Sequence, residues 1–271
     1  MRPPDRPGTA VPILLYHGVG EDTSGPLGPY TLPLRVFRDH MSWIADQGFT
    51  TISVGQLAEV RSGSRSLPPR PLVITFDDGL ADFANHALPV LRSFGHASTM
   101  YVTTAATWSR EPRTLGGRLA MSAGQIAEAA AAGVEMGGHG HEHPQLDLLP
   151  AARVRAELHR CKDRLEQLVG TEVASFAYPH GYHRATTRRL VREAGFTSAC
   201  AVRNRVSHLD DDPFALARIM LTSGQGVSFL ERGLGGALAR AGRGGRVRAA
   251  AWRAARLVRT GGRPAVRVER A

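Results

Sequence analysis

The chain has 271 residues, of which 42% are hydrophobic and 21% charged, the composition of an ordinary globular protein large enough for one α/β domain. Its net charge of +10 does not indicate a nucleic-acid-binding protein, because eleven Arg and one acid from Arg232 to the end account for the whole excess. We therefore expect no nucleic-acid partner and a neutral body over residues 1–231, and we divide the chain into one domain over residues 1–223 and a basic tail over residues 224–271.

Short apolar runs rich in β-branched residues alternate with helical patterns, which predicts repeated β–α units around a parallel sheet. In chain order, strands are expected at Val11–Tyr16, Phe49–Ser53, Leu72–Phe76, Ala97–Val102, Val134–Gly137, Ala174–Tyr178 and Thr197–Val202, with a short one near Arg218–Leu221. Helices are expected at residues 34–45 and 83–91, from Ser122 onward, behind Pro150 and before Gly195. Seven or eight strands predict a (β/α) barrel, complete or not, and a doubly wound open sheet is the alternative.

Neither cysteine indicates a disulfide or a thiol metal site. Cys161 falls on the apolar stripe of a predicted helix and Cys200 in a predicted strand, so both are interpreted as small core residues. The N-terminus lacks the apolar region of a signal peptide and no run is long enough to span a membrane, so a cytoplasmic location is predicted.

The basic tail has two interpretations. It is either a solvated segment or an interfacial helix, with Ala and Val on one side and Arg on the other. The second interpretation would bring the protein into peripheral contact with the anionic inner face of the membrane. The sequence makes no prediction of the oligomeric state.

Polar clusters follow four of the predicted strands, at the place where parallel α/β folds form their sites. These clusters are Tyr16-His17, Asp77-Asp78-Gly79, His139 to His143, and Tyr178-Pro179-His180-Gly181. Because the carboxyl ends of parallel strands lie on one side of a sheet, we expect these side chains to form a common site.

Two of these clusters suggest a metal ion. On a helical turn, His139 and His143 would project from one face and His141 from the opposite one, although such a pair alone fits two structural histidines equally well. The adjacent carboxylates Asp77 and Asp78 favour a metal, because they need a compensating positive charge or hydrogen bonds. One carboxylate with two His is a common ligand set, and the other Asp can act as a base toward the attacking water. The alternative is that the Asp pair caps the following helix.

The segments YHGV, TFDDG, EMGGHGHEHPQL and FAYPHG occur in the order and spacing of a known family. From about Leu14 to Leu221 the chain resembles the NodB-homology polysaccharide deacetylases, carbohydrate esterase family 4. It is most similar to the branch with YHxV and with YPxG in place of RxPxG, which includes enzymes that deacetylate poly-N-acetylglucosamine. The resemblance implies a distorted (β/α) barrel of about seven strands that removes N-acetyl groups from amino sugars. It also implies one divalent metal ion, zinc being expected and cobalt, nickel, manganese and iron being alternatives.

The resemblance also assigns roles to residues of this chain. Asp77 is similar to the general base and Asp78 to the metal-binding carboxylate, while His139 and His143 match the two metal-binding histidines. His17 matches the histidine that this branch is proposed to use as the general acid. The substrate and oxyanion motif is matched by Tyr178, Pro179, His180 and Gly181, and the backbone N–H around His180 is its oxyanion donor.

The sequence departs from the family pattern in places. Ala177 stands where most members have the Arg that orients the catalytic Asp, and no Asp-rich motif with the reciprocal role is evident. Gly138 and Gly140 replace hydroxyl residues, which predicts a looser site with Asp77 held differently. The acidic run 210–212 before Pro213 is expected to form a turn. These departures leave two alternatives to a deacetylase, a non-catalytic sugar-binding barrel and a metal amidohydrolase for a small non-sugar amide.

Overall fold

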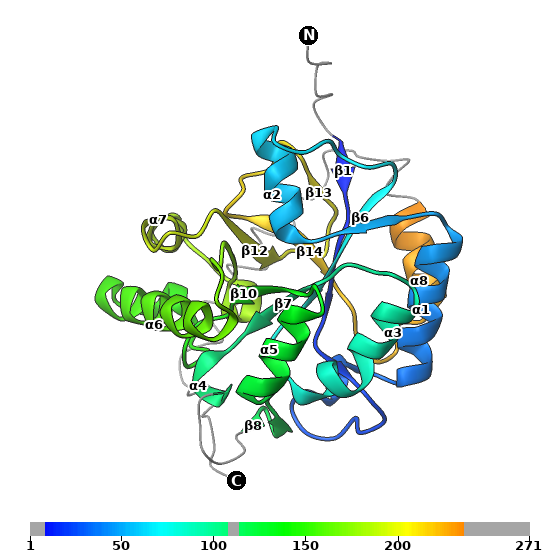
Figure 1. Ribbon diagram of the computed structural model, residues 1–271, viewed down its shortest axis with the longest axis horizontal. Coiled ribbons are helices and arrows are strands. Elements are labelled where there is room, and N and C mark those ends of the chain that lie inside the picture. The colour runs from blue at the N-terminus through cyan, green and yellow to red at the C-terminus, as the bar shows by residue number, and fades with distance from the viewer. Residues whose placement is uncertain (1–8, 108–113, 236–271) are drawn as a thin grey trace, which may run out of the picture.

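In a computed structural model, which describes residues 9–107 and 114–235, seven parallel strands close into a barrel (Figure 1). The strands are β2 (Ile13–Tyr16), β14 (Leu216–Met220), β12 (Ser198–Val202), β11 (Ser175–Ala177), β10 (Glu135–Gly138), β7 (Thr99–Val102) and β6 (Pro71–Phe76). The ring closes because β2 pairs with β14 on one edge and with β6 on the other. The predicted barrel is therefore confirmed, and the open-sheet alternative is wrong.

The barrel is distorted beside β6. An eighth strand, β5 (Thr50–Ile52), pairs with the first half of β6 at residues 71–73. The second half of β6 pairs with β7 instead, Thr75 opposite Thr99 and Phe76 opposite Met100. One edge of β6 is thus shared by two strands, which makes the ring irregular on that side.

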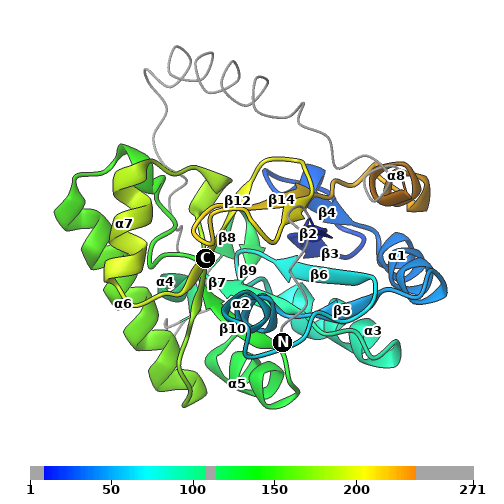
Figure 2. The same cartoon turned by 90° about the horizontal axis from the view of Figure 1, so that it is seen from above.

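The predicted helices cover the outside of the barrel (Figure 2). They are α1 (Leu34–Asp46), η2 (Phe83–Ala87) with α3 (Leu88–Ser93), α5 (Ala123–Ala131), α6 (Ala151–Val169) and α7 (Ala185–Glu193). The predicted capping box is present, because Ser122 accepts from the Gln125 N–H and the Gln125 side chain accepts from the Ser122 N–H. Cys161 in α6 and Cys200 in β12 are buried free thiols, as predicted.

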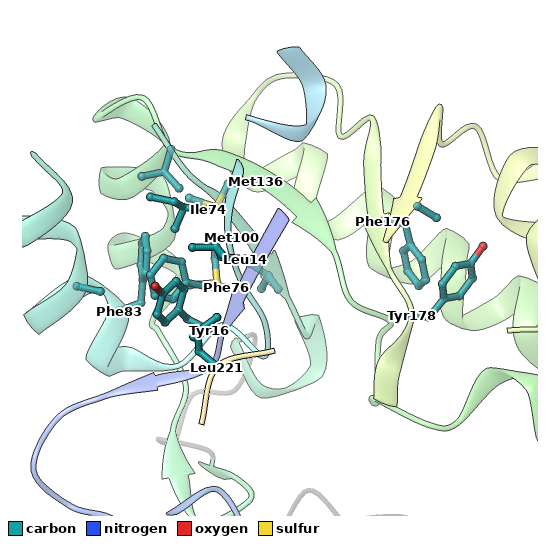
Figure 3. Close-up of a cluster of buried hydrophobic side chains, with 14 of the residues drawn as sticks. Leu14, Tyr16, Ile74, Phe76, Phe83, Met100, Met136, Phe176, Tyr178 and Leu221 are labelled. Carbon is teal, nitrogen blue, oxygen red and sulfur yellow. The ribbon is translucent and has the colours of Figure 1, made fainter. Parts of the chain in front are cut away.

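The larger hydrophobic core lies between the helices and the outward faces of the strands. Figure 3 shows Leu14, Ile74, Phe76, Met100 and Met136 gathered together, with Phe176 and Tyr178 further along the same core. Each such fully buried side chain stabilises the fold by about 1.5–3 kcal/mol relative to an exposed one. The strands are thereby held in fixed register beneath the loops that follow them.

A second core fills the barrel itself. Its inward side chains include Ile13, Val73, Tyr101 and Cys200, packed against the helix α2 (Val54–Ser62). Figure 1 shows α2 at the end of the barrel opposite the hairpin strand β8 (Thr114–Leu115). The sequence analysis did not predict this helix, although Ser53 and Gln56 form a capping box in front of it. α2 thus covers one end of the barrel, and the polar clusters follow the carboxyl ends of the strands at the other.

The remaining elements are short. They are β1 (Ala10–Val11), β3 (Gly18–Val19), η1 (Gly28–Tyr30), β4 (Thr31–Leu32), α4 (Thr104–Thr107), β9 (Arg118–Leu119), η3 (Leu146–Leu148), η4 (Pro179–Gly181), β13 (Ser207–His208), α8 (Val227–Leu230) and η5 (Glu231–Gly235). The acidic run 210–212 lies in the turn predicted for it, where Asp211 accepts from the N–H of His208 and Asp212 from that of Phe214.

The segment predicted as a tail begins with ordered structure. α8 and η5 belong to it, and their Leu230 and Leu234 are buried in the larger core. The Arg-rich remainder, residues 236–271, lies outside the described residues, so the division at residue 223 stays a prediction. Among the helices described, none combines the length and apolar character needed to cross a bilayer.

Candidate active site

The four predicted clusters lie at the carboxyl end of the barrel. His17 follows β2, Asp77 follows β6, His139 follows β10 and His180 lies in the turn after β11. The backbone N–H of Asp77 donates to the carbonyl of Tyr16 at 3.0 Å, which ties two of these strand ends together. The expected common site is met in part, because the side chains of Tyr16 and Tyr178 lie in the larger core instead. The hydroxyl of Tyr16 is 3.1 Å from Nδ1 of His40, and that of Tyr178 donates to the carbonyl of Phe214 at 3.0 Å.

Asp78, His139 and His143 form a compact group of potential metal ligands. Oδ1 of Asp78 lies 3.5 Å from Nε2 of His139 and 3.3 Å from Nε2 of His143, and the two nitrogens are 3.2 Å apart. Nδ1 of His139 is 2.8 Å from the carbonyl of Ala177, so that nitrogen can carry the proton and leave Nε2 free to bind a cation. One oxygen and two nitrogens in this arrangement fit a divalent ion.

The electrostatics of the group also suit a cation. Burial by itself would raise the pKa of Asp78, but hydrogen bonds from His139 and His143 hold it well below its usual range. Burial would likewise lower the pKa of His139, and the neighbouring Asp77 and Asp78 outweigh that effect and raise it. The two carboxylates thus favour a positive charge at His139, which a bound cation could supply instead.

The segment from His139 to His143 does not form the helical turn on which the pairing of its histidines was considered. The segment is a bend, in which Gly140 has a φ of 81° and His143 a φ of 60°. Asp78 has a φ of 78° and His180 a φ of 60°, so three of the five non-glycine residues with positive φ in the described chain belong to this site. Such backbones cost about 1–3 kcal/mol each and persist where surrounding contacts impose them.

His141 points away from the ligand group, as predicted. Its Nδ1 lies 2.9 Å from Oγ1 of Thr104 on α4, and it is not part of the metal-ligand group. The bend therefore places His139 and His143 on one side and His141 on the other, as a helical turn would, but with different backbone angles.

Asp77 is held by a residue that the sequence analysis did not identify. Arg218 on β14 donates to both of its carboxylate oxygens, Nη1 to Oδ1 at 2.6 Å and Nη2 to Oδ2 at 2.7 Å. Arg218 is fully buried, and it also donates to Thr75 at 3.2 Å and to the carbonyl of Ala201 at 3.3 Å. Burial would raise the pKa of Asp77, but Arg218 and then His139 outweigh it, so the carboxyl stays ionised.

The barrel explains why Arg218 can take this role. Inward side chains of a barrel form layers contributed by alternate strands, and β6, β14 and β11 alternate around this ring. Ala177 on β11 places only a methyl group in the barrel interior. The guanidinium that binds Asp77 belongs to Arg218 on β14, the next alternate strand. The departure at Ala177 is thus compensated in space. An Arg inside the apolar strand LARIM was the available signal, since such a buried charge needs a partner.

The site is closely packed at Gly138, next to His139, and not loose as expected. A Cβ there would lie 3.1 Å from both Phe176 and Phe196 and 3.2 Å from the sulfur of Cys161. These larger side chains fill the space beside the glycine. Asp77 is indeed held differently, as predicted, and the holding group is a rigid, bidentate one.

The loop that carries His17 is fixed from outside the barrel. The N–H of Val19 donates to Oδ2 of Asp82 at 3.2 Å, and the carbonyl of Val19 lies 2.7 Å from Nδ1 of His86. Burial raises the pKa of Asp82 to about 6, against the opposing effect of Val19 and Arg118. Burial lowers the pKa of His17. The negative charges of Asp78 and then Asp77 oppose this effect, so His17 interacts electrostatically with both carboxylates.

Backbone hydrogen bonds tie down both ends of the turn after β11. Pro179 has no N–H, the N–H of Tyr178 donates to Cys200 at 3.1 Å, and that of Gly181 donates to Tyr178 at 2.7 Å. The resemblance places the oxyanion donor at the amide of His180, whose imidazole lies 4.8 Å from that of His143. Gly181 is needed here, because at its φ of 75° a Cβ would approach Val202 to 2.5 Å.

The fold and the site together describe a (β/α) barrel with a buried carboxylate, Asp77, beside a group of potential metal ligands. The model of the family called polysaccharide deacetylase matches residues 64–199, half of the chain, and the chain belongs to that family. The matched segment contains Asp77, Asp78, His139 and His143. His17 and Arg218 lie outside it.

Two curated relatives differ in how much of them the chain covers. The Bacillus subtilis protein YxkH, named as a polysaccharide deacetylase, is 22% identical over 218 residues, 80% of this chain and 74% of that protein. The Escherichia coli poly-β-1,6-N-acetyl-D-glucosamine N-deacetylase is 29% identical over 79 residues, 29% of this chain and only 12% of that protein.

Among solved structures, the Streptococcus pyogenes deacetylase PplD in complex with acetate superposes with a TM-score of 0.74 at 20% identity. The superposition covers 84% of this chain and 98% of that one. At this identity the likeness bears on the fold, and it agrees with the deacetylase barrel that the sequence motifs predict.

Proposed function

We propose that this protein is a metal-dependent hydrolase that removes N-acetyl groups from an amino sugar in a polysaccharide, an oligosaccharide or a glycan precursor. One observation carries the proposal: Asp77 is ionised and locked by Arg218 at 2.6 and 2.7 Å, with Oδ2 3.7 Å from Nε2 of His139 in the candidate metal group. A fixed carboxylate base beside three metal ligands is the arrangement that amide hydrolysis needs.

The metal, with zinc expected and cobalt, nickel, manganese or iron as alternatives, would be held by Asp78, His139 and His143 and would supply a Lewis acid for the amide carbonyl and the attacking water. Asp77 accepts the proton of that water, because Arg218 keeps it ionised and leaves it no freedom to turn away.

The later proton transfers fall to other groups. His17 donates a proton to the departing amine, without which the C–N bond does not break. The N–H of His180 donates to the carbonyl oxygen as negative charge develops there. Asp77 and His17 thus act as base and acid at opposite stages of one hydrolysis.

The substrate class rests on the relatives. The name of the Escherichia coli protein specifies a polymer of N-acetylglucosamine, and the Streptococcus pyogenes structure contains acetate, the product of such a reaction. We extend this chemistry to the present chain as N-acetylated carbohydrate, with no polymer specified. The alternative of a non-catalytic barrel was considered because Ala177 cannot orient Asp77. Arg218 orients Asp77 instead, which favours the catalytic interpretation.

The test is acetate release from N-acetylated oligosaccharides and sugar–lipid intermediates, with and without a metal chelator. We expect chelation to abolish release and Asp77→Asn to lower it by orders of magnitude. Sugar binding without acetate release would support the non-catalytic barrel and overturn the proposal. Turnover of small non-sugar amides alone would support the metal amidohydrolase instead.

A further inference from the structure

A buried carboxylate outside the candidate active site holds the loop between the two histidines. Glu157 lies in the second turn of α6 and is only 3% exposed. Its Oε2 accepts from the N–H of His141 and from that of Glu142, both at 2.8 Å. Taking a carboxylate out of water costs several kcal/mol unless hydrogen bonds compensate it. Here the ligand loop itself supplies those bonds.

The opposite side of the same loop is attached to α4. The carbonyl of Gly140 accepts from the N–H of Thr104 at 3.3 Å, and that of His141 accepts from Ala105 at 2.8 Å. Carbonyl groups of the loop therefore accept hydrogen bonds from α4, and its N–H groups donate hydrogen bonds to Glu157. It also passes close to that carboxylate, since a Cβ on Gly140 would lie 3.6 Å from Oε2.

This attachment bears on His143 because of its backbone. At a φ of 60°, His143 occupies a conformation that a non-glycine residue adopts only when its surroundings impose it. The two amides fixed by Glu157 belong to the residues immediately before it. Released from Glu157, the loop can relax toward ordinary backbone angles, and Nε2 of His143 would leave its position 3.3 Å from Asp78.

We propose that Glu157 is a positioning residue of the metal site, whose carboxylate preorganises the His139–His143 bend for a divalent ion. The inference rests on the proposed function, because it assumes that Asp78, His139 and His143 bind the metal. Groups that orient metal ligands in this way typically change metal affinity by about 10- to 100-fold when removed.

The experiment measures zinc affinity of the full-length protein by competition with a chromophoric chelator. We expect Glu157→Ala to weaken zinc binding by about 10- to 100-fold. Glu157→Gln should stay within a few-fold of wild type, because its amide oxygen can still accept both N–H groups. Glu166→Ala is the matched control, since Glu166 on the same helix also accepts a backbone N–H, from Val173 at 2.9 Å, far along α6 from the loop.

A second readout separates positioning from stability. In the cobalt-substituted protein, Glu157→Ala should change the visible absorption spectrum of the metal, while Glu166→Ala should leave it as in wild type. If Glu157→Ala does not fold, Glu157→Asp takes its place, because its shorter carboxylate stays charged but recedes from the two amides. We expect that variant also to bind zinc more weakly than wild type.

The outcomes distinguish the inference from the function beneath it. Wild-type affinity and an unchanged cobalt spectrum in a folded Glu157→Ala or Glu157→Asp variant would overturn the positioning role and leave the metal site intact. Equal losses in Glu157→Ala and Glu166→Ala would also overturn it, since they would indicate a general effect of α6. Failure of the wild-type protein to bind zinc or cobalt would overturn the metal site and the positioning role together.

Discussion

Replacing Arg218 with Met removes the positive charge from Asp77 while keeping most of the buried volume. Both groups are almost fully buried, with side-chain exposures of 0% and 3%. Removal of one partner from such a pair costs about 3–5 kcal/mol, because the other charge stays buried and unpaired. For a domain of this size that corresponds to a fall in Tm of roughly 10 °C.

The same substitution changes the pH dependence in a direction that can be worked out. In wild type the pKa of Asp77 lies below its unfolded value, so the pair stabilises the fold above that value, and this stability is lost as pH falls through the folded pKa. Without Arg218 the burial effect, which raises the pKa of Asp77, is no longer outweighed by the guanidinium. The acidic limb of kcat/KM should therefore move to higher pH, in addition to a large loss of rate.

A double-mutant cycle measures the coupling. Urea unfolding of Asp77→Asn, Arg218→Met and the double variant should show a double variant more stable than the sum of the single effects by about 3 kcal/mol. All three should be nearly inactive, so stability recovers without activity. Additive unfolding energies, or an acidic limb of Arg218→Met at the wild-type pH, would refute the argued role of the pair.

Further outcomes follow from the candidate site and the tail. Changing His139 and His143 together to Ala should abolish stoichiometric zinc, measured by metal analysis; retained zinc would contradict the ligand set. Asp77→Asn should keep the metal and lose activity, whereas Asp78→Asn should lose metal affinity; equal metal loss in both would contradict their separate roles. Deleting residues 236–271 should keep activity on a soluble substrate. If the tail is interfacial, the deletion should also end low-salt co-sedimentation with anionic vesicles, to which each Arg contributes about 1 kcal/mol; absence of binding by the full-length protein would leave the solvated interpretation.

The sequence by itself determined the strands, most of the outer helices and the residues of the candidate site. Apolar β-branched runs such as VITF are visible locally, and so are the polar residues that follow them, such as Asp77 and Asp78. Parallel strands bring their carboxyl ends together whatever their order, so the clustering of these residues followed without knowledge of the topology. The spacing of His139 and His143 suggested a ligand pair only together with the Asp77–Asp78 pair and the family motifs, and the backbone between the histidines is a bend.

Tertiary structure alone decided which groups hold those residues. Arg218 and Asp77 are 141 residues apart, and they meet because closure of the barrel places β14 and β6 on either side of β2. Glu157 reaches the histidine loop because α6 packs on β10, a contact that its helical pattern does not specify. A local pattern encodes which face of an element is buried, but not what it is buried against. The partners of buried charges are fixed only when the strand order and the closure of the sheet are known.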